Sequence, residues 1–458
     1  MPENPTIREE TRHRTPGKFT FPARLSAHIV LLVLVFALLG AASCSKQAAQ
    51  TTLPNAEPTA TATDLPQPTE PAVSASPTPG SSQISLRVWI PPEFAITADS
   101  LTFSEIVTGF EAAYPGIRIE LSAKRAIGKG GLLDMLQGAA KVAPGYLPDL
   151  ILMDHAETAL AIERGLLQAM DPLLASPAGE HVFASILVSG TSNGMRYGLP
   201  FALDFLHLAY RTSITSSFPL NWTTVLDSDG RYLFASGGSE NYSSDAILIQ
   251  YLGVDGGLKD AEGKPAMDSR LLTRVLDAYK QMSDEGTLAA ESLRLNSPDG
   301  VWDMYKAGEA DFAEVWASQF KAEALSIPDT SFGRIPTRNG RAIALAHVWV
   351  WSIPARTPER QQAAASFLDW VTAPSRQRAW CEAALLLPAG PGAWPLPRVS
   401  IEYSLFLMHL AEEATPFPVG FRSAMVSAAL QEALAQVIAG SASPKQAAEQ
   451  AIVKMKLQ

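Results

Sequence analysis

The sequence predicts an α/β protein of two lobes joined by a hinge, and three observations support this fold class. Residues 84–165 alternate strand and helix patterns, the βαβ rhythm of a parallel sheet covered by helices. An apolar extended segment at residues 197–210 contains Gly198 and Pro200. Because proline donates nothing to a strand ladder, this segment favours a crossing between two bodies. The 458 residues are also enough for two cores.

The first 44 residues are predicted to be a targeting segment. Basic residues between Arg8 and Arg24 precede an apolar run, residues 29–39, that is too short to span a bilayer comfortably. The sequence GAASC at residues 40–44 follows and resembles the lipobox of bacterial lipoproteins, in which the cysteine is lipidated, although Ala41 stands where leucine is usual. A plain signal peptide or an uncleaved anchor, with Cys44 incidental, is the alternative.

Residues 45–83 are predicted to be a disordered tether. They are rich in Thr, Pro, Ala and Ser, so they bury too little apolar surface to repay ordering. With a lipid on Cys44, the tether would hold an exported body at the outer face of the cytoplasmic membrane while leaving it free to turn.

The folded body is expected to begin with a buried strand at residues 84–90. Further strands are predicted at residues 117–121 and 150–153, with a helix around residues 132–142 between them. In such sheets ligands bind beyond the carboxyl ends of the strands. Residues 89–94 and the pair Asp154-His155 are therefore expected at the mouth of a site.

Beyond residue 210 the pattern becomes more helical. Short strands are predicted at residues 232–235 and 310–316, and a longer buried one at residues 345–353. A second segment punctuated by Gly and Pro, residues 332–337, is the candidate for the return crossing. These assignments put residues 84–200 and 337–392 in lobe I and residues 201–336 and 393–458 in lobe II.

Charge and cysteine content limit the classes of partner. The formal net charge is -10 and the body has no basic run, which argues against a nucleic-acid partner because phosphate contacts need Lys and Arg. If Cys44 is lipidated, Cys381 has no partner for a disulfide. We expect Cys381 to be a buried small apolar residue.

The sequence gives little support to an enzyme. Residues 190–194 match the G-x-S-x-G nucleophile elbow, but that motif needs a helix directly after it, and a strand-like pattern follows. We interpret these residues as a turn between two extended segments. No zinc-ligand spacing, P-loop or G-x-G-x-x-G is present, so no cofactor is expected. A pair of acids for glycoside hydrolysis stays open, because their spacing is spatial.

The ordered set of patterns resembles the extracellular solute-binding proteins of family 1, the receptors of carbohydrate-type ABC importers. The resemblance rests on Cys44, the tether, and the sequences ISLRVWIPPEF, LPDLILMDHAE, YGLPFALDFLHLAY, GEADFAEVWAS and HVWVWSIPARTPERQQAAASFLDWVTAPSRQRAW. It covers nearly all of residues 84–458. It implies a periplasmic-binding-protein type II fold, a monomer that closes on its ligand in the cleft and delivers it to a membrane permease. Many relatives carry a Gly-Gly pair before the strand that here reads Ala346-His347-Val348-Trp349, so this wall of the cleft is expected to be bulkier.

A sugar-like ligand would suit the aromatic and acidic residues near strand ends. Sugar rings pack their C–H faces on aromatic rings, and their hydroxyls need hydrogen-bond partners. Trp316 is a candidate for stacking on the ligand, because the family often has an aromatic residue after that strand. Asp204 is a candidate because it directly follows the predicted hinge. For each residue a core, capping or surface role is the alternative. The candidate ligand-binding residues are Trp89, Glu93, Asp154, Asp204, Trp316, His347, Trp349 and Trp351.

Other ligands and roles stay open within the same architecture. More carboxylates in the cleft would favour a polyamine, and paired tyrosines would favour ferric ion. A secreted lipoprotein that senses or scavenges without transport is a competing class.

Overall fold

The computed structural model describes residues 83–95, 101–174, 182–237 and 244–455. All of these residues fall within one compact unit. The predicted targeting segment and nearly all of the predicted tether lie outside the described residues. Within the described ranges, no helix is both long and apolar enough to cross a membrane.

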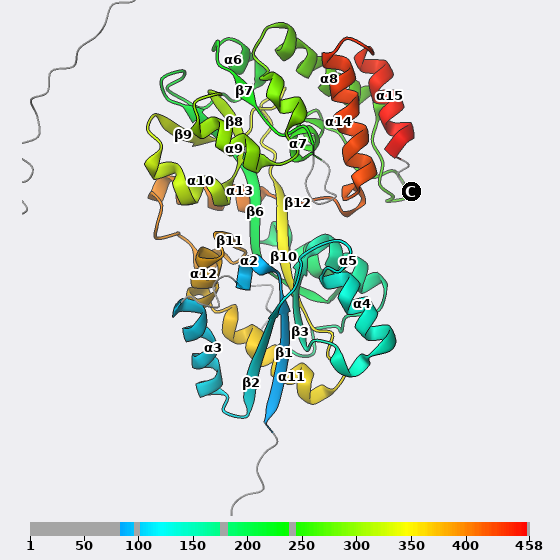
Figure 1. Cartoon of the computed structure of the whole chain (residues 1–458), viewed down its shortest axis with the longest axis vertical. Helices are drawn as coiled ribbons and strands as arrows, with labels where there is room; N and C mark the ends of the chain where they lie inside the picture. The colour runs from blue at the N-terminus through cyan, green and yellow to red at the C-terminus, as the bar shows by residue number, and fades with distance from the viewer. Residues whose placement is uncertain (1–82, 96–100, 175–181, 238–243, 456–458) are drawn as a thin grey trace, which may run out of the picture. The chain divides into compact units, whose positions relative to one another are not determined.

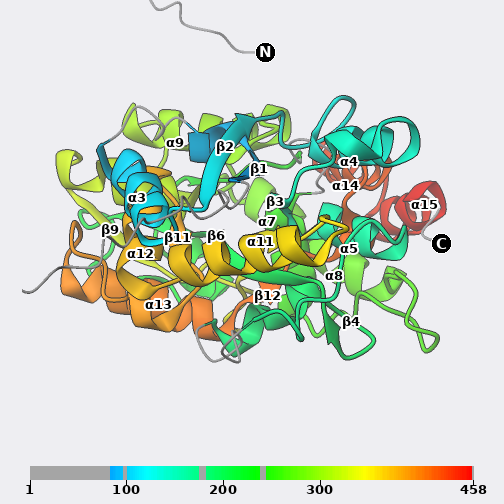
Figure 2. The same cartoon turned by 90° about the horizontal axis from the view of Figure 1, so that it is seen from below.

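Three parallel strands form the core of the first body, in the order β2-β1-β3 (Figure 1). They are β1 (Ile84–Ile90), β2 (Ile117–Ala123) and β3 (Leu150–Asp154). The surrounding helices are α2 (Pro92–Ala95), α3 (Leu101–Ala113), α4 (Leu132–Val142), α5 (His155–Glu163), α11 (Pro358–Val371) and α12 (Pro374–Ala383). Figure 2 views this body from below, with α11 between α3 and α5. The βαβ rhythm predicted for residues 84–165 is therefore present.

Residues on the two faces of this sheet pack into different clusters. Val88 belongs to a core that includes Phe110 of α3 and Phe367 of α11. Trp89 belongs to a second cluster, with Leu133 of α4. Neighbouring residues on a strand point to opposite faces, so a continuously apolar strand such as β1 is covered on both sides.

Two long antiparallel strands connect the bodies. These are β6 (Gly198–Arg211) and β10 (Leu345–Ser352), which pair from Gly198 opposite Ser352 to Phe205 opposite Ala346. The other half of β6 pairs with strands of the second body, and β10 also pairs with β3. Residues 197–210 thus form the predicted crossing.

The proline in this crossing is accommodated by an irregularity in the strand pairing. The register shifts between Trp349 and Val350, opposite Ala202 and Pro200. Proline within a sheet is confined to edges, strand starts and such bulges. Gly198 is needed for close approach, since a Cβ atom there would lie 2.4 Å from Val350 Cγ1.

The predicted return crossing at residues 332–337 is wrong. Residues 330–333 form β9 (Thr330–Gly333), which pairs with the second half of β6, inside the second body. The strand that returns to the first body is β10 (Figure 1). Gly and Pro mark local breaks in regular structure, whereas strand partners are set by the packed sheet.

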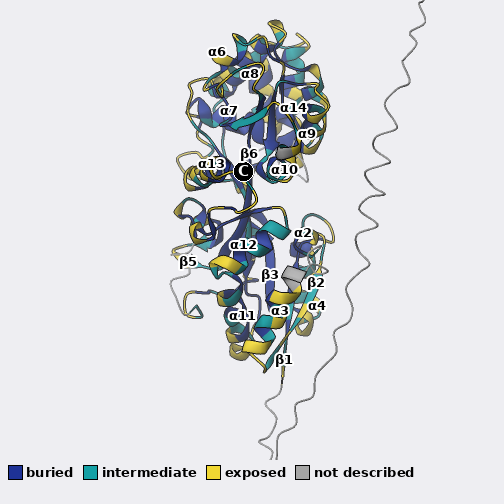
Figure 3. Ribbon diagram, turned by 90° about the vertical axis from the view of Figure 1, so that its left-hand side faces the viewer, coloured by how far each residue is buried: buried dark blue, intermediate teal, exposed yellow. Residues whose placement is uncertain are grey.

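The second body packs short strands against many helices. Its strands beside β6 and β9 are β7 (Tyr232–Leu233) and β8 (Phe312–Trp316), and its helices are α6 (Trp222–Leu226), α7 (Asp245–Gly253), α8 (Ser269–Asp284), α9 (Pro298–Lys306), α10 (Ala317–Glu323), α13 (Ile401–Glu413), α14 (Ala424–Ile438) and α15 (Pro444–Met455). Two short strands, β11 (Leu387–Pro388) and β12 (Thr415–Pro416), pair with β6 and β10. Figure 3 shows buried residues along the central strands of both bodies and exposed ones on outer helix surfaces.

The G-x-S-x-G sequence forms a hairpin. It joins β4 (Thr191–Ser192) to β5 (Met195–Arg196), with φ of 49° at Asn193 and 75° at Gly194. Positive φ at both central residues is typical of a tight hairpin turn. No helix follows Ser192, which confirms the predicted turn. Cys381 is a free cysteine and fully buried, as expected.

Candidate ligand-binding site

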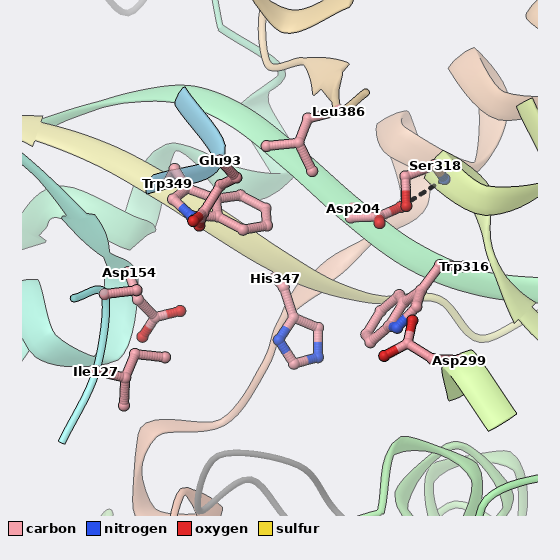
Figure 4. A pocket seen from close by; sticks show the side chains of 11 residues that line it. Glu93, Ile127, Asp154, Asp204, Asp299, Trp316, Ser318, His347, Trp349 and Leu386 are labelled. Carbon is pink, nitrogen blue, oxygen red and sulfur yellow. Dashed lines mark hydrogen bonds between the residues drawn. The ribbon is translucent and has the colours of Figure 1, made fainter. Parts of the chain in front are cut away.

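A pocket of about 470 Å³ lies where the two bodies meet at β6 and β10. Figure 4 shows Glu93, Asp154 and Ile127 on one side and Asp204, Trp316 and Asp299 on the other, with His347 between them. Its lining residues are Glu93, Ala126, Ile127, Asp154, Asp204, Asp299, Trp316, Ser318, His347, Trp349 and Leu386. The volume falls in the range of small-molecule sites, about 300–1,000 Å³.

The two tryptophans of the pocket are held by different bodies. Trp316 ends β8, and its backbone N–H donates to Gln319 Oε1 at 3.4 Å. Trp349 lies on β10, packs edge-on against Phe94 at 5.9 Å between ring centroids, and donates from Nε1 to Glu93 Oε1 at 3.1 Å. The Trp349 ring is therefore positioned before a ligand arrives.

Asp204 is nearly buried where β6 faces the pocket, with 5% of the residue exposed. The backbone N–H groups of Phe205 and Ser318 donate to Asp204 Oδ1 at 3.0 and 3.2 Å. Burial raises the pKa of Asp204 to about 6, although hydrogen bonds from Ser318 and Phe205 act to lower it. Near neutral pH this buried carboxylate is ionised and poorly hydrated, so a donor from a ligand would be strongly favourable.

Glu93 and Asp154 stand on the other side. Burial raises the pKa of Glu93, partly offset by its backbone hydrogen bond and by the Trp349 indole. Asp154 ends β3 and caps α5, because its Oδ1 accepts from the Ala156 N–H at 2.8 Å. The capping role considered for Asp154 from the sequence therefore coexists with a place in the pocket.

His347 lies between the two sides, and its Nε2 is 2.8 Å from Asp245 Oδ2. Burial acts to lower the pKa of His347, but the charge and hydrogen bond of Asp245 outweigh this effect and the pKa is raised. The Trp316 ring stands edge-on to the imidazole, 5.0 Å between centroids. Asp245 therefore holds the His347 imidazole in position, and the Trp316 ring packs against this imidazole.

The family model described as bacterial extracellular solute-binding protein matches residues 105–400. The chain belongs to this family. A search of curated proteins gives no match for this solute-binding protein.

Solved structures of similar fold include several sugar-binding proteins. The cyclic α-maltosyl-1,6-maltose binding protein of Arthrobacter globiformis has 17% sequence identity and a TM-score of 0.66, over 81% of this chain and 98% of that one. The GacH receptor of Streptomyces glaucescens, with structures unliganded and in complex with acarbose, has 18% identity and a TM-score of 0.61, over 80% and 96%. Maltose-bound MalE3 of T. maritima has 16% identity and a TM-score of 0.62, over 81% and 99%.

At these identities the likeness shows the fold alone, and it confirms the predicted two-lobed α/β fold of this solute-binding protein. The predicted lobe boundaries stay a prediction. Among the described residues, no cluster of His, Cys, Asp and Glu is arranged to hold a metal ion.

Six of the eight predicted ligand-binding residues line the pocket, and two lie elsewhere. Trp89 is on the opposite face of β1, packed with Leu133 under α4, with the Lys124 ammonium 5.7 Å from its ring. Trp351 shares a strand face with Trp349, but Phe201 and Trp380 cover it completely. We therefore correct the sequence-based placement of these two tryptophans beside the ligand.

Five lining residues of the binding protein were missed by the sequence reasoning. Ser318 follows Trp316 by two positions, so the strand-end signal that selected Trp316 could have found it. Asp299 lies in the first turn of α9, whose start is marked in the sequence by Ser297-Pro298, so its place at a helix end could have been found in the same way. Leu386 and the loop residues Ala126 and Ile127 carry no signal of their own, because tertiary packing alone brings them to the pocket.

Proposed function

We propose that this chain is the substrate-binding lipoprotein of an ABC importer, which captures a sugar or oligosaccharide by hinge closure and delivers it to a membrane permease. The observation that carries the proposal is the pairing of two indole rings with several carboxyl groups in one pocket between the bodies. Indole faces suit the C–H faces of a sugar ring, and carboxylates suit its hydroxyls.

Closure would follow from the position of the site. A ligand that contacts Glu93 and Trp349 together with Trp316 and Asp204 touches both bodies, so it gains contacts as they approach each other. Such a ligand favours the closed state only by these extra contacts. The two strands β6 and β10 are the segments that would absorb the rotation.

Export and anchoring rest on the N-terminal sequence. Cys44 after its small residues would take the lipid, and the tether of residues 45–83 would set how far the body reaches from the membrane. The fold and family support a binding role rather than an enzymatic one.

Calorimetry with the full-length chain in detergent tests the proposal. A panel of mono- and oligosaccharides should contain ligands whose affinity falls at least about tenfold, or ~1.4 kcal/mol, in Trp316→Ala and Trp349→Ala. Tyr146→Ala is the matched control, because Tyr146 is 75% exposed and is absent from the pocket lining. The proposal fails if no saccharide binds, or if the tryptophan variants bind as tightly as the Tyr146 control.

A polyamine receptor of the same fold is the second candidate. Four carboxyl groups line the pocket, which is the feature that would favour a polyamine over a neutral sugar. Putrescine and spermidine in the same calorimetry panel separate the two candidates.

A further inference from the structure

The pocket lining is strongly acidic. Four of its residues carry a carboxyl group, namely Glu93, Asp154, Asp204 and Asp299, and none of the lining residues is Lys or Arg. Neutral sugars offer hydroxyl donors to such groups but no charge. The excess of carboxyl groups therefore bears on the class of ligand.

The cations around the pocket already have partners. His347 is held by Asp245 at 2.8 Å. Arg422 lies 3.9 Å from Asp154 Oδ1 and 3.4 Å from Glu157 Oε1, so its charge is shared between two acids.

Lys321 is a further cation near the pocket, because it contacts the lining residue Leu386. It donates from Nζ to the Leu386 carbonyl at 2.8 Å. Burial lowers the pKa of Lys321, against the charges of neighbouring acids that include Asp204. Its ammonium group is thus directed at a neutral carbonyl.

Three of the pocket acids receive hydrogen bonds from neutral donors. Glu93 accepts from the Trp349 indole, and Asp204 accepts from two backbone N–H groups. Asp299 accepts from the Gln319 amide and from the Ser297 hydroxyl. Within the described part of the chain, none of these three carboxyl groups has an ion-pair partner.

The indole rings would complement a positive charge in the same place. Figure 4 shows Asp204 and Asp299 near Trp316, and Glu93 against Trp349. A cation over an indole face is attracted by the ring quadrupole, and the attraction grows when water is excluded. A group that is both ring-shaped and cationic would use the rings and the carboxylates together.

On the basis of the proposed sugar-binding function, we propose that the preferred ligand is a saccharide that carries a protonated amine, with the ammonium group bound by Asp204 beside Trp316. Two rings on opposite sides of the pocket favour a cyclic skeleton over a linear polyamine. The ammonium supplies both N–H donors and a positive charge, and the one basic residue of the described lining, His347, is already paired with Asp245. Glu93 and Asp299 add to the attraction from the two sides.

Matched saccharides test this inference at pH 7 with the full-length chain in detergent. The panel contains glucosamine, galactosamine and their oligomers, each beside the N-acetylated and the hydroxyl counterpart. We expect the best amine to bind at least tenfold more tightly than its two counterparts, and to lose part of this preference in high salt.

Asp204→Asn should reduce the preference for the amine at least tenfold, because the amide keeps the size of the side chain and removes its charge. Asp255→Asn is the control, since Asp255 is exposed and paired with Arg341 away from this pocket. If Asp204→Asn does not fold, Asp299→Asn provides the same comparison with a smaller expected loss.

The outcomes separate this inference from the proposed function. Tighter or equal binding of the hydroxyl or N-acetylated sugar overturns the inference and leaves the sugar receptor standing. Binding of putrescine or spermidine, with no saccharide bound, overturns both. If nothing in the panel binds, both fail.

Discussion

Replacing Asp204 with Asn should stabilise the protein at neutral pH, and the gain should depend on pH. Asp204 is nearly buried, and burial raises its pKa from 3.8 to about 6. A folded-state pKa above the unfolded value means that the folded protein binds the proton more tightly. The contribution of this tighter proton binding to the free energy of unfolding is fully present below about pH 4, and it is lost as the pH rises through about 6.

The size of the effect follows from the same values. A rise from 3.8 to about 6 corresponds to about 3 kcal/mol, at roughly 1.4 kcal/mol for each pH unit. The amide introduced by Asp204→Asn would keep an oxygen that accepts from the Phe205 and Ser318 N–H groups, so these two hydrogen bonds survive. The variant should therefore equal the natural protein near pH 4 and exceed it by about 3 kcal/mol above pH 7.

Urea unfolding at pH 4, 5, 6, 7 and 8 measures this difference. Subtracting the free energy of unfolding of the natural chain from that of Asp204→Asn removes the contribution of every other titrating group. Asp255→Asn, at a side chain that is 77% exposed, should change stability by under about 1 kcal/mol throughout. A difference for Asp204→Asn that stays flat with pH, or that is negative at pH 8, would show that the buried Asp204 carboxylate does not destabilise the fold at neutral pH.

Three further predictions follow from other groups. Burial raises the pKa of Glu314 to about 8, although the Tyr232 hydroxyl donates a hydrogen bond to this carboxyl group. The free energy of unfolding of Glu314→Gln, measured in urea, should therefore exceed that of the natural chain by up to about 5 kcal/mol as the pH rises from about 4.5 to 9. Arg422→Met should cost about 3 kcal/mol because it leaves Glu157 buried without its ion-pair partner, and adding Glu157→Gln should restore part of the loss; an unchanged melting temperature in the single variant would contradict this. Cys44→Ser should move the exported protein from the membrane fraction to the soluble one, and equal membrane recovery of both chains would argue against lipidation.

Local patterns in the sequence located most of the first body. The strand at residues 84–90 and the helix at residues 132–142 were placed at the bounds that the structure has. Both are set by apolar periodicity and by breakers such as Gly131, which depend on near neighbours. The crossing at residues 197–210 also follows from the sequence, because a mostly apolar extended run with Gly198 and Pro200 is unusual for a central strand.

The return crossing could not be found in this way. Residues 332–337 carry Gly and Pro and look like a break, whereas β10 looks like an ordinary buried strand. Which of them spans the two bodies depends on pairing with β3 and β6, whose residues lie more than a hundred positions away. Register and partner are properties of the packed sheet.

Residue patterns along the chain are enough to predict the fold class, the family resemblance and the strand ends at which a site would form. Which tryptophans reach the pocket depends instead on packing between distant segments. Trp349 and Trp351 lie two positions apart on one face of β10, yet Trp351 is covered by Phe201 and Trp380 and Trp349 is not. A strand pattern fixes the face of a side chain, because successive residues alternate. What covers that face comes from distant segments, and burial is therefore decided by packing.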